Sequence, residues 1–157
     1  MVPRKAPPPQ GLRNEGPFAG IIGAAGNTPI ASWLRNLADS WLASPVLPNR
    51  GKFLMMAVIA RQLGSRICEE EAKLCLGGEG LAAQEIDTIL STLGSPVLTP
   101  LESTLVRWTR ETVWHEPRVI QNSTRRLQGE WGEEQTLEAV GTAAVGNTLA
   151  RLSLVKQ

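Results

Sequence analysis

The chain has 157 residues, 42% of them hydrophobic, which is enough apolar content for one domain with its own core. Its 16 Lys and Arg residues nearly balance 15 Asp and Glu residues, so the formal net charge is +1. This charge gives no electrostatic reason to expect nucleic acid or an anionic membrane surface as a partner. The longest strongly apolar run, residues 53–60, is far too short to cross a membrane. Two cysteines without a disulfide framework, and no apolar leader segment, predict a cytoplasmic protein.

Residues 1–27 are rich in proline and glycine and predict an extended, flexible N-terminal arm. The glycine-rich run GIIGAAG at 20–26 lacks the preceding strand that a dinucleotide-binding loop needs. We therefore expect a loop that packs on the first helix.

From Thr28 onward the apolar residues recur at helical spacing, and no segment alternates as a strand would. The sequence therefore predicts an all-α fold, a single domain of six to seven helices over residues 28–157. We expect these helices over residues 29–42, 50–63, 65–78, 81–93, 100–114, 117–127 and 133–154, with Gly129 to Gly132 as an interruption.

Three of these helices carry more specific expectations. The helix over 50–63 is apolar on nearly every side, which predicts a central, buried position. Trp33 and Trp41 lie on the apolar face of the first helix and should contact the core or another subunit. In the last helix we expect an inward face made of Leu137, Val140, Ala144, Val145, Leu149 and Leu152.

Both cysteines fall on the helix over 65–78. Cys68 and Cys75 are seven residues apart, so they share a face but stand roughly 10 Å apart along the axis. Bridged cysteines have Cα atoms about 4.4–6.8 Å apart, so these two cannot form a disulfide without breaking the helix. Cys75 sits between Leu74 and Leu76, where core packing is the favoured interpretation.

Three segments carry a resemblance to a known family. These are PNRGKFLMMAVIARQLGSRICEEEAKLCLGGEGL at 48–81, LTPLESTLVRWTRETV at 98–113, and Val145-Gly-Asn147-x-x-x-Arg151-Leu. In this order and spacing, the chain from about Thr28 to Leu154 resembles the carboxymuconolactone decarboxylase family, and in particular its alkylhydroperoxidase D-like branch. The resemblance implies the helical fold of that branch and a homo-oligomer, either a trimer or a hexamer.

The resemblance also implies a peroxidase active site, but most of the residues of that site are replaced in this sequence. The family's peroxide-reacting cysteine falls on Cys68, but its resolving cysteine falls on Ser65. Its glutamate falls on Phe53, and the histidine that follows the cysteines falls on Ala72. The implied activity is therefore a one-cysteine, thiol-dependent hydroperoxidase, in which Cys68 is oxidised to a sulfenic acid and reduced by an external thiol. No cofactor and no metal are expected.

The residues around Cys68 have opposing effects on its reactivity. A helix N-terminus and Arg66 would lower the pKa of its thiol, whereas Glu69, Glu70 and Glu71 would raise it. One alternative is therefore a non-catalytic, oligomeric relative in which Cys68 is only packed. The single histidine, His115, is expected at a helix end or the surface, and one histidine cannot build a histidine-rich metal site.

A second alternative is a cysteine-independent decarboxylase or lyase that acts on a small organic acid. Its apolar pocket would be lined by Phe53, Met56 and a tryptophan, and Arg61 would bind the carboxylate of the substrate. The residues expected to support a small-molecule site are therefore Ser65, Arg61, Phe53 and Met56, beside the catalytic candidate Cys68.

Overall fold

The computed structural model describes residues 16–114 and 116–155, and within these ranges it contains eight α-helices and no strand. The all-α prediction is confirmed, with at least one helix more than expected. The helices are α1 (Ala19–Gly23), α2 (Pro29–Ala43), α3 (Asn49–Leu63), α4 (Arg66–Gly78), α5 (Ala83–Thr92), α6 (Pro100–Val113), α7 (Pro117–Trp131) and α8 (Glu133–Leu154).

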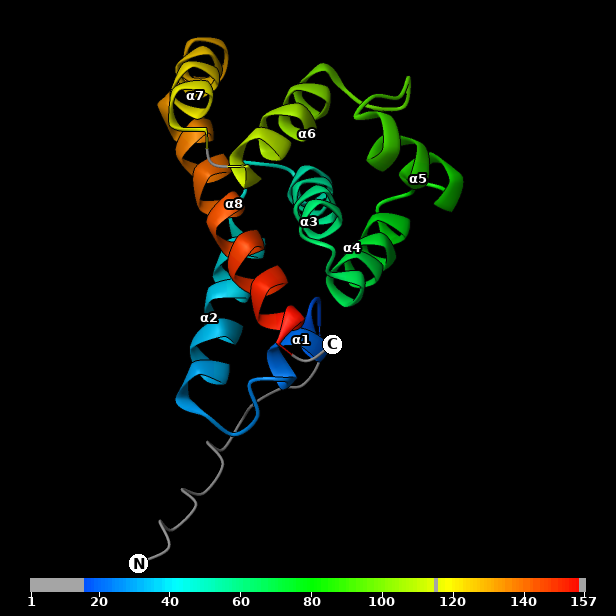
Figure 1. Ribbon diagram of the computed structural model, residues 1–157, viewed down its shortest axis with the longest axis vertical. Coiled ribbons are helices and arrows are strands. Elements are labelled where there is room, and N and C mark those ends of the chain that lie inside the picture. Colours follow the sequence, from blue (N-terminus) through cyan, green and yellow to red (C-terminus); the bar gives the residue numbers. More distant parts are fainter. Residues whose placement is uncertain (1–15, 115, 156–157) are drawn as a thin grey trace, which may run out of the picture.

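Helix α3 is the centre of the molecule. Every residue from Gly51 to Ala60 is buried, and α3 packs on α4, α6 and α8. Figure 1 shows α3 in the middle of these three helices, with α2 and α5 on opposite sides of the molecule. The predicted central burial of this helix is confirmed, because a helix that is apolar all round needs neighbours on every side.

Local signals in the sequence set several helix ends. Thr99 Oγ1 accepts a hydrogen bond from the Glu102 N–H at 3.2 Å, and Glu102 Oε2 accepts one from the Thr99 N–H at 2.8 Å. This reciprocal pair is a capping box, and it begins α6. Arg50 reaches the same carboxylate, with its Nε 2.9 Å from Glu102 Oε1, and so joins α3 to the start of α6. Gly64 ends α3 in the left-handed conformation, with φ 73°.

One break between helices differs from expectation. The interruption predicted over 129–132 is narrower in the structure, because Gly129 lies inside α7 and the chain turns only at Gly132, with φ 83°. One glycine inside a helix costs only about 1 kcal/mol, which the packing of α7 on α6 and α8 can offset.

The described part of the expected arm is folded. Residues 1–15 lie outside the described ranges, but residues 16–27 contain α1, where a loop was expected. Helix α1 packs on α2, and the side chains of Phe18, Ile21 and Ile22 are buried in the core.

The predicted inward face of α8 is only half right. Val145 and Leu149 are buried, but Leu137 is 62% exposed, Val140 is 43% exposed, and Ala144 is also exposed. The cause is the composition of α8, which has apolar residues on all sides, so that periodicity cannot tell the covered face from the open one. On α2, Trp41 is buried whereas Trp33 is 59% exposed.

No helix in the described ranges is long and apolar enough to span a membrane.

Candidate functional site

Cys68 lies in the first turn of α4, and Ser65 sets the position of that turn. Ser65 is the N-cap residue, and its Oγ accepts a hydrogen bond from the Cys68 backbone N–H at 3.3 Å. The same hydroxyl contacts Ser153 Oγ on α8, and both serines are buried. The position where the resemblance implies a resolving thiol is therefore occupied by a capping group that also ties α4 to α8.

The Cys68 thiol is buried away from solvent. Its side chain is 0% exposed, and its Sγ lies 3.5 Å from Met56 Sδ in α3. Burial, and secondarily the charge of Glu71, raise its pKa to about 12. At pH 7 the thiol is therefore protonated, whereas the thiolate is the form that reacts. The effects that would acidify Cys68, a helix N-terminus and Arg66, are outweighed by desolvation.

Phe53 and Met56 are core residues. Phe53 is 5% exposed and its ring lies 6.4 Å from that of Phe18, while Met56 is 0% exposed. Gly146 of α8 comes so close that a Cβ there would lie 3.6 Å from Met56 Sδ. Phe18 also contacts a tryptophan, Trp41, with the two ring centroids 6.0 Å apart. The structure thus brings Ser65, Cys68 and Met56 together, but as packed neighbours and not around an open space.

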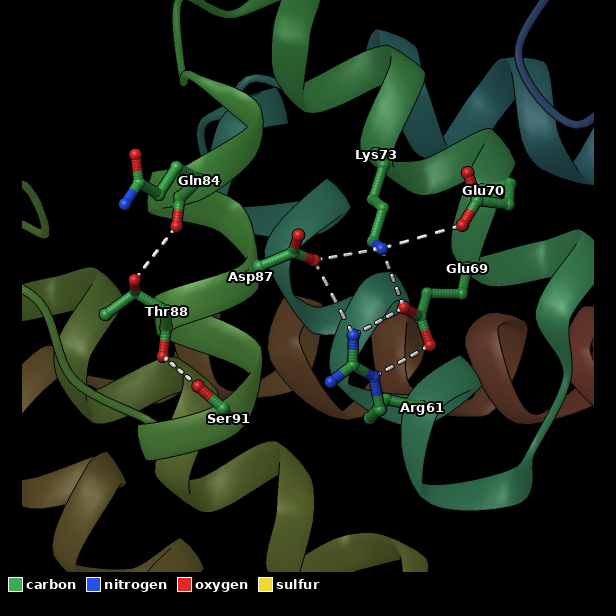
Figure 2. Close-up of polar contacts among 8 residues, drawn as sticks. All are labelled: Arg61, Glu69, Glu70, Lys73, Gln84, Asp87, Thr88 and Ser91. Atoms are coloured by element: carbon green, nitrogen blue, oxygen red, sulfur yellow. Dashed lines mark hydrogen bonds and ion pairs between the residues drawn. The ribbon is translucent and has the colours of Figure 1, made fainter.

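Arg61 points away from this core into a network of charges, which Figure 2 shows between α3, α4 and α5. Its guanidinium makes two hydrogen bonds to Glu69, with Nε–Oε2 at 2.9 Å and Nη2–Oε1 at 2.6 Å. Lys73 Nζ lies 3.1 Å from Glu69 Oε1 and 3.0 Å from Asp87 Oδ1. The bond to Arg61 holds the pKa of Glu69 below its usual value. The two N–H donors of Arg61 that would bind a substrate carboxylate therefore already bind Glu69.

The three consecutive glutamates behind Cys68 have three different surroundings. Glu69 belongs to the network just described, and Glu70 is exposed with one long contact to Lys73 at 3.5 Å. Glu71 is half-buried, and its carboxylate lies against α1, where a Cβ on Gly20 would be 2.5 Å from Glu71 Oε1. Burial raises the pKa of Glu71, and the nearby backbone of Ile21 and Gly20 lowers it to a smaller extent. The carboxylate thus packs between α1 and α4.

Sequence reasoning missed Lys52, which is 0% exposed in the middle of the molecule. Its Nζ donates to the carbonyl oxygens of Trp41 at 2.6 Å and Ser44 at 2.7 Å, and it lies 3.2 Å from Glu138 Oε1. The cation therefore sits at the C-terminal end of α2, where the helix dipole favours positive charge. The available signal was a single lysine directly before the apolar run 53–60.

A groove runs between α2 and α8 on the side of the molecule opposite α5. It has a volume of about 480 Å³ and is mostly apolar, with Trp33, Leu37 and Trp41 on one wall and Gly141, Ala144, Val145 and Thr148 on the other. Trp41 Nε1 donates to Thr142 Oγ1 at 3.0 Å and joins the two walls at depth. Besides these apolar residues, the lining contains the hydroxyl groups of serine and threonine residues and one charged residue, Glu138, which pairs with Lys52.

Within the described ranges, no three His, Cys, Asp or Glu side chains lie close enough together to hold a metal ion. His115 lies outside those ranges.

Comparison with known proteins finds no relative: no family model, no curated protein and no solved structure matches the chain.

Proposed function

We propose that this chain is a non-catalytic helical protein that works by self-association through the surface over α2 and α8. The observation that carries this proposal is the group of large apolar side chains left exposed there. Ile30 is 58% exposed and Trp33 59% exposed on α2, and Leu137 is 62% and Val140 43% exposed on α8. Trp33 lines the groove, and the other three side chains lie on the two helices that form its walls. Exposed apolar side chains on neighbouring helices are typical of an interaction surface.

The energetic reason for association is the removal of these side chains from water. Fully burying a side chain of the size of Leu or Phe contributes roughly 1.5–3 kcal/mol. Tryptophan is also enriched at interfaces, because it covers a large area at a small cost in conformational entropy. The expectation that Trp33 contacts another subunit is part of this proposal.

The one-cysteine hydroperoxidase is less well supported. That activity needs a thiolate that peroxide and an external reductant can both reach. Cys68 is 0% exposed and burial raises its thiol pKa to about 12, so both requirements work against it.

The decarboxylase or lyase alternative is also less well supported. It needs an open apolar pocket beside Phe53 and Met56, and these side chains are packed in the core. It also needs a free Arg61, whose guanidinium instead binds Glu69 through two hydrogen bonds.

On this proposal the chain is a divergent relative of the alkylhydroperoxidase D-like proteins that has kept helix packing around Cys68 and lost the site. The short turn at Gly64 and Ser65 that leads from α3 into the cysteine helix supports it. The trimer or hexamer that the resemblance implies is a prediction that the measured mass of the assembly tests.

The test is the molar mass of the purified protein across the micromolar range, measured by light scattering after size exclusion. We expect an oligomer for the wild type and a monomer for Trp33→Glu and for Leu137→Glu. Leu74→Glu is the matched control, since Leu74 is 77% exposed but lies on α4, away from the groove. A wild type that stays monomeric throughout, or a control that dissociates as readily as the two groove variants, refutes the proposal.

A further inference from the structure

Six exposed positions form a single stripe along α8. They are Glu134, Leu137, Gly141, Ala144, Thr148 and Arg151, and all six are exposed while the residues between them include the buried face of the helix. Their spacing of three, four, three, four and three residues is the pattern by which one helix contacts another along a seam.

The stripe is complementary to the same stripe of a second α8 helix that runs in the opposite direction. In an antiparallel pair of α8 helices centred between residues 142 and 143, Glu134 meets Arg151, Leu137 meets Thr148, and Gly141 meets Ala144. The two charged positions at the ends have opposite signs, and neither forms an ion pair within the described chain. The two positions at the centre are the smallest residues of the stripe.

We propose that two copies of this chain pair through α8 in the antiparallel direction, with Glu134 of each copy bound to Arg151 of the other. The occupant of the groove between α2 and α8 is thus the α8 helix of a second copy. This proposal rests on the self-association proposed above and adds the partner surface, its direction and its register.

The small residues at the centre allow the close approach that such a pair needs. A Cβ placed on Gly141 would meet no atom within 4 Å, so the chain itself leaves this part of α8 open. Glu134 and Arg151 are 17 residues apart, or about 25 Å along the helix, so a two-fold axis gives one ion pair at each end of the seam.

Charge decides between the two possible directions. A parallel pair would place Glu134 against the same glutamate and Arg151 against the same arginine, which is repulsive at both ends. The antiparallel pair makes both contacts attractive. It also brings Leu137 of the partner subunit to Thr148, in the groove that Trp33 lines, so the most exposed apolar residue of α8 is covered.

The test is charge reversal at the two ends of the seam, with the dissociation constant measured by sedimentation equilibrium. Glu134→Arg places two arginines together at both ends, and Arg151→Glu places two glutamates together. We expect each single variant to weaken association about tenfold or more, and the double variant Glu134→Arg/Arg151→Glu to restore it. Glu79→Arg and Arg125→Glu are matched controls, because both positions are exposed, lie off α8 and change the net charge equally.

The outcomes separate this inference from the proposed function. A monomeric wild type overturns both. An oligomer that is indifferent to the single reversals, or that is weakened by them and not restored by the double variant, overturns the antiparallel pairing alone. A mass that corresponds to a simple trimer also overturns it, because a ring of three has no two-fold axis, whereas a dimer or a hexamer can contain the pair. Far-ultraviolet circular dichroism of each variant checks that the exposed substitutions leave the fold intact.

Discussion

Lys52 joins three helices through one buried ammonium group. It lies on α3, and its partners are the carbonyls of Trp41 and Ser44 at the end of α2 and the carboxylate of Glu138 on α8. Removing it leaves two carbonyls unpaired and Glu138, with a side chain only 21% exposed, without a counter-charge.

We therefore expect Lys52→Met to lower the free energy of unfolding by about 3 kcal/mol, because removing one partner of a buried ion pair leaves the other charge without compensation. Urea denaturation measures it. Lys73→Met is the comparison, because Lys73 has a 23% exposed side chain in a surface network, where an ion pair is worth about 1 kcal/mol or less. Equal losses in the two variants would contradict the structural role given to Lys52.

The raised pKa of the Cys68 thiol predicts how its contribution to stability depends on pH. Its thiol pKa is raised from 9.0 to about 12, so the folded state keeps it protonated where the unfolded state ionises. Its contribution to stability is therefore full below about pH 9 and is lost as the pH rises through about 12. The same shift protects the thiol from reagents that need the thiolate.

We expect pulse alkylation with iodoacetamide to leave Cys68 unmodified in the native protein from pH 7 to pH 9, as read by peptide mass spectrometry, and to modify it in urea. Peroxide consumption with a thiol reductant should be equal in the wild type, Cys68→Ala and Cys75→Ala. Rapid native labelling of Cys68, or a loss of peroxide consumption in Cys68→Ala alone, would restore the one-cysteine hydroperoxidase as the better hypothesis.

The contact between α3 and α8 depends on a glycine. A Cβ on Gly146 would lie 2.6 Å from Ile59 Cδ1, closer than real Cβ contacts, and Ile59 is itself 0% exposed. Gly129 of α7 has the opposite surroundings, since it is exposed and a Cβ there would meet nothing within 4 Å. The same substitution at the two sites therefore separates packing from helix propensity.

We expect Gly146→Ala to destabilise the protein by roughly 1–3 kcal/mol through overpacking. Gly129→Ala should stabilise it by up to about 1 kcal/mol, because alanine is the better helix former. Urea denaturation of both variants measures the two effects. If Gly146→Ala is neutral or stabilising, α8 does not approach α3 as closely as the structure has it.

The elements that sequence predicts best are those with a local signal. The start of the helix expected from residue 100 and the central burial expected for the apolar helix over 50–63 are both confirmed. Each follows from a signal within a few residues, the Thr99 and Glu102 capping box in one case and a continuous apolar run in the other. The exposed face of α8 and the burial of Lys52 were not predictable, because each depends on which distant helix lies alongside. Gly129 misled for the same reason: a weak local preference against helix is outweighed by tertiary contacts.

The candidate site shows the same limit. The position of Cys68 in the first turn of a helix follows from the Gly64–Ser65 turn and the pattern after it. The reactivity of Cys68 does not follow from the sequence, since the nearby groups that lower its thiol pKa and those that raise it have effects of similar magnitude. Burial under α3 and α8 decides it, and burial is a property of the whole packing.

At the scale of the whole molecule, two sides of α3 have opposite character. On the α4 and α5 side, charged groups satisfy one another in the network of Arg61, Glu69, Lys73 and Asp87 (Figure 2). On the α2 and α8 side, the groove is mostly apolar, and Trp33 on one of its walls is 59% exposed. The surface over α2 and α8 is therefore suited to a stable contact.

Association through that surface should link the stability of the fold to protein concentration, because a partner that binds only the folded state stabilises it by mass action. For a dimer, a tenfold rise in concentration should raise the free energy of unfolding by about 1.4 kcal/mol per dimer. We expect the urea midpoint of the wild type to rise accordingly, and that of Ala144→Lys, which places a charge at the centre of the exposed face of α8, to stay constant. Intrinsic tryptophan fluorescence follows both transitions. The prediction fails if the wild-type midpoint does not move with concentration, or if Ala144→Lys moves equally, since the contact that stabilises the fold would then lie elsewhere.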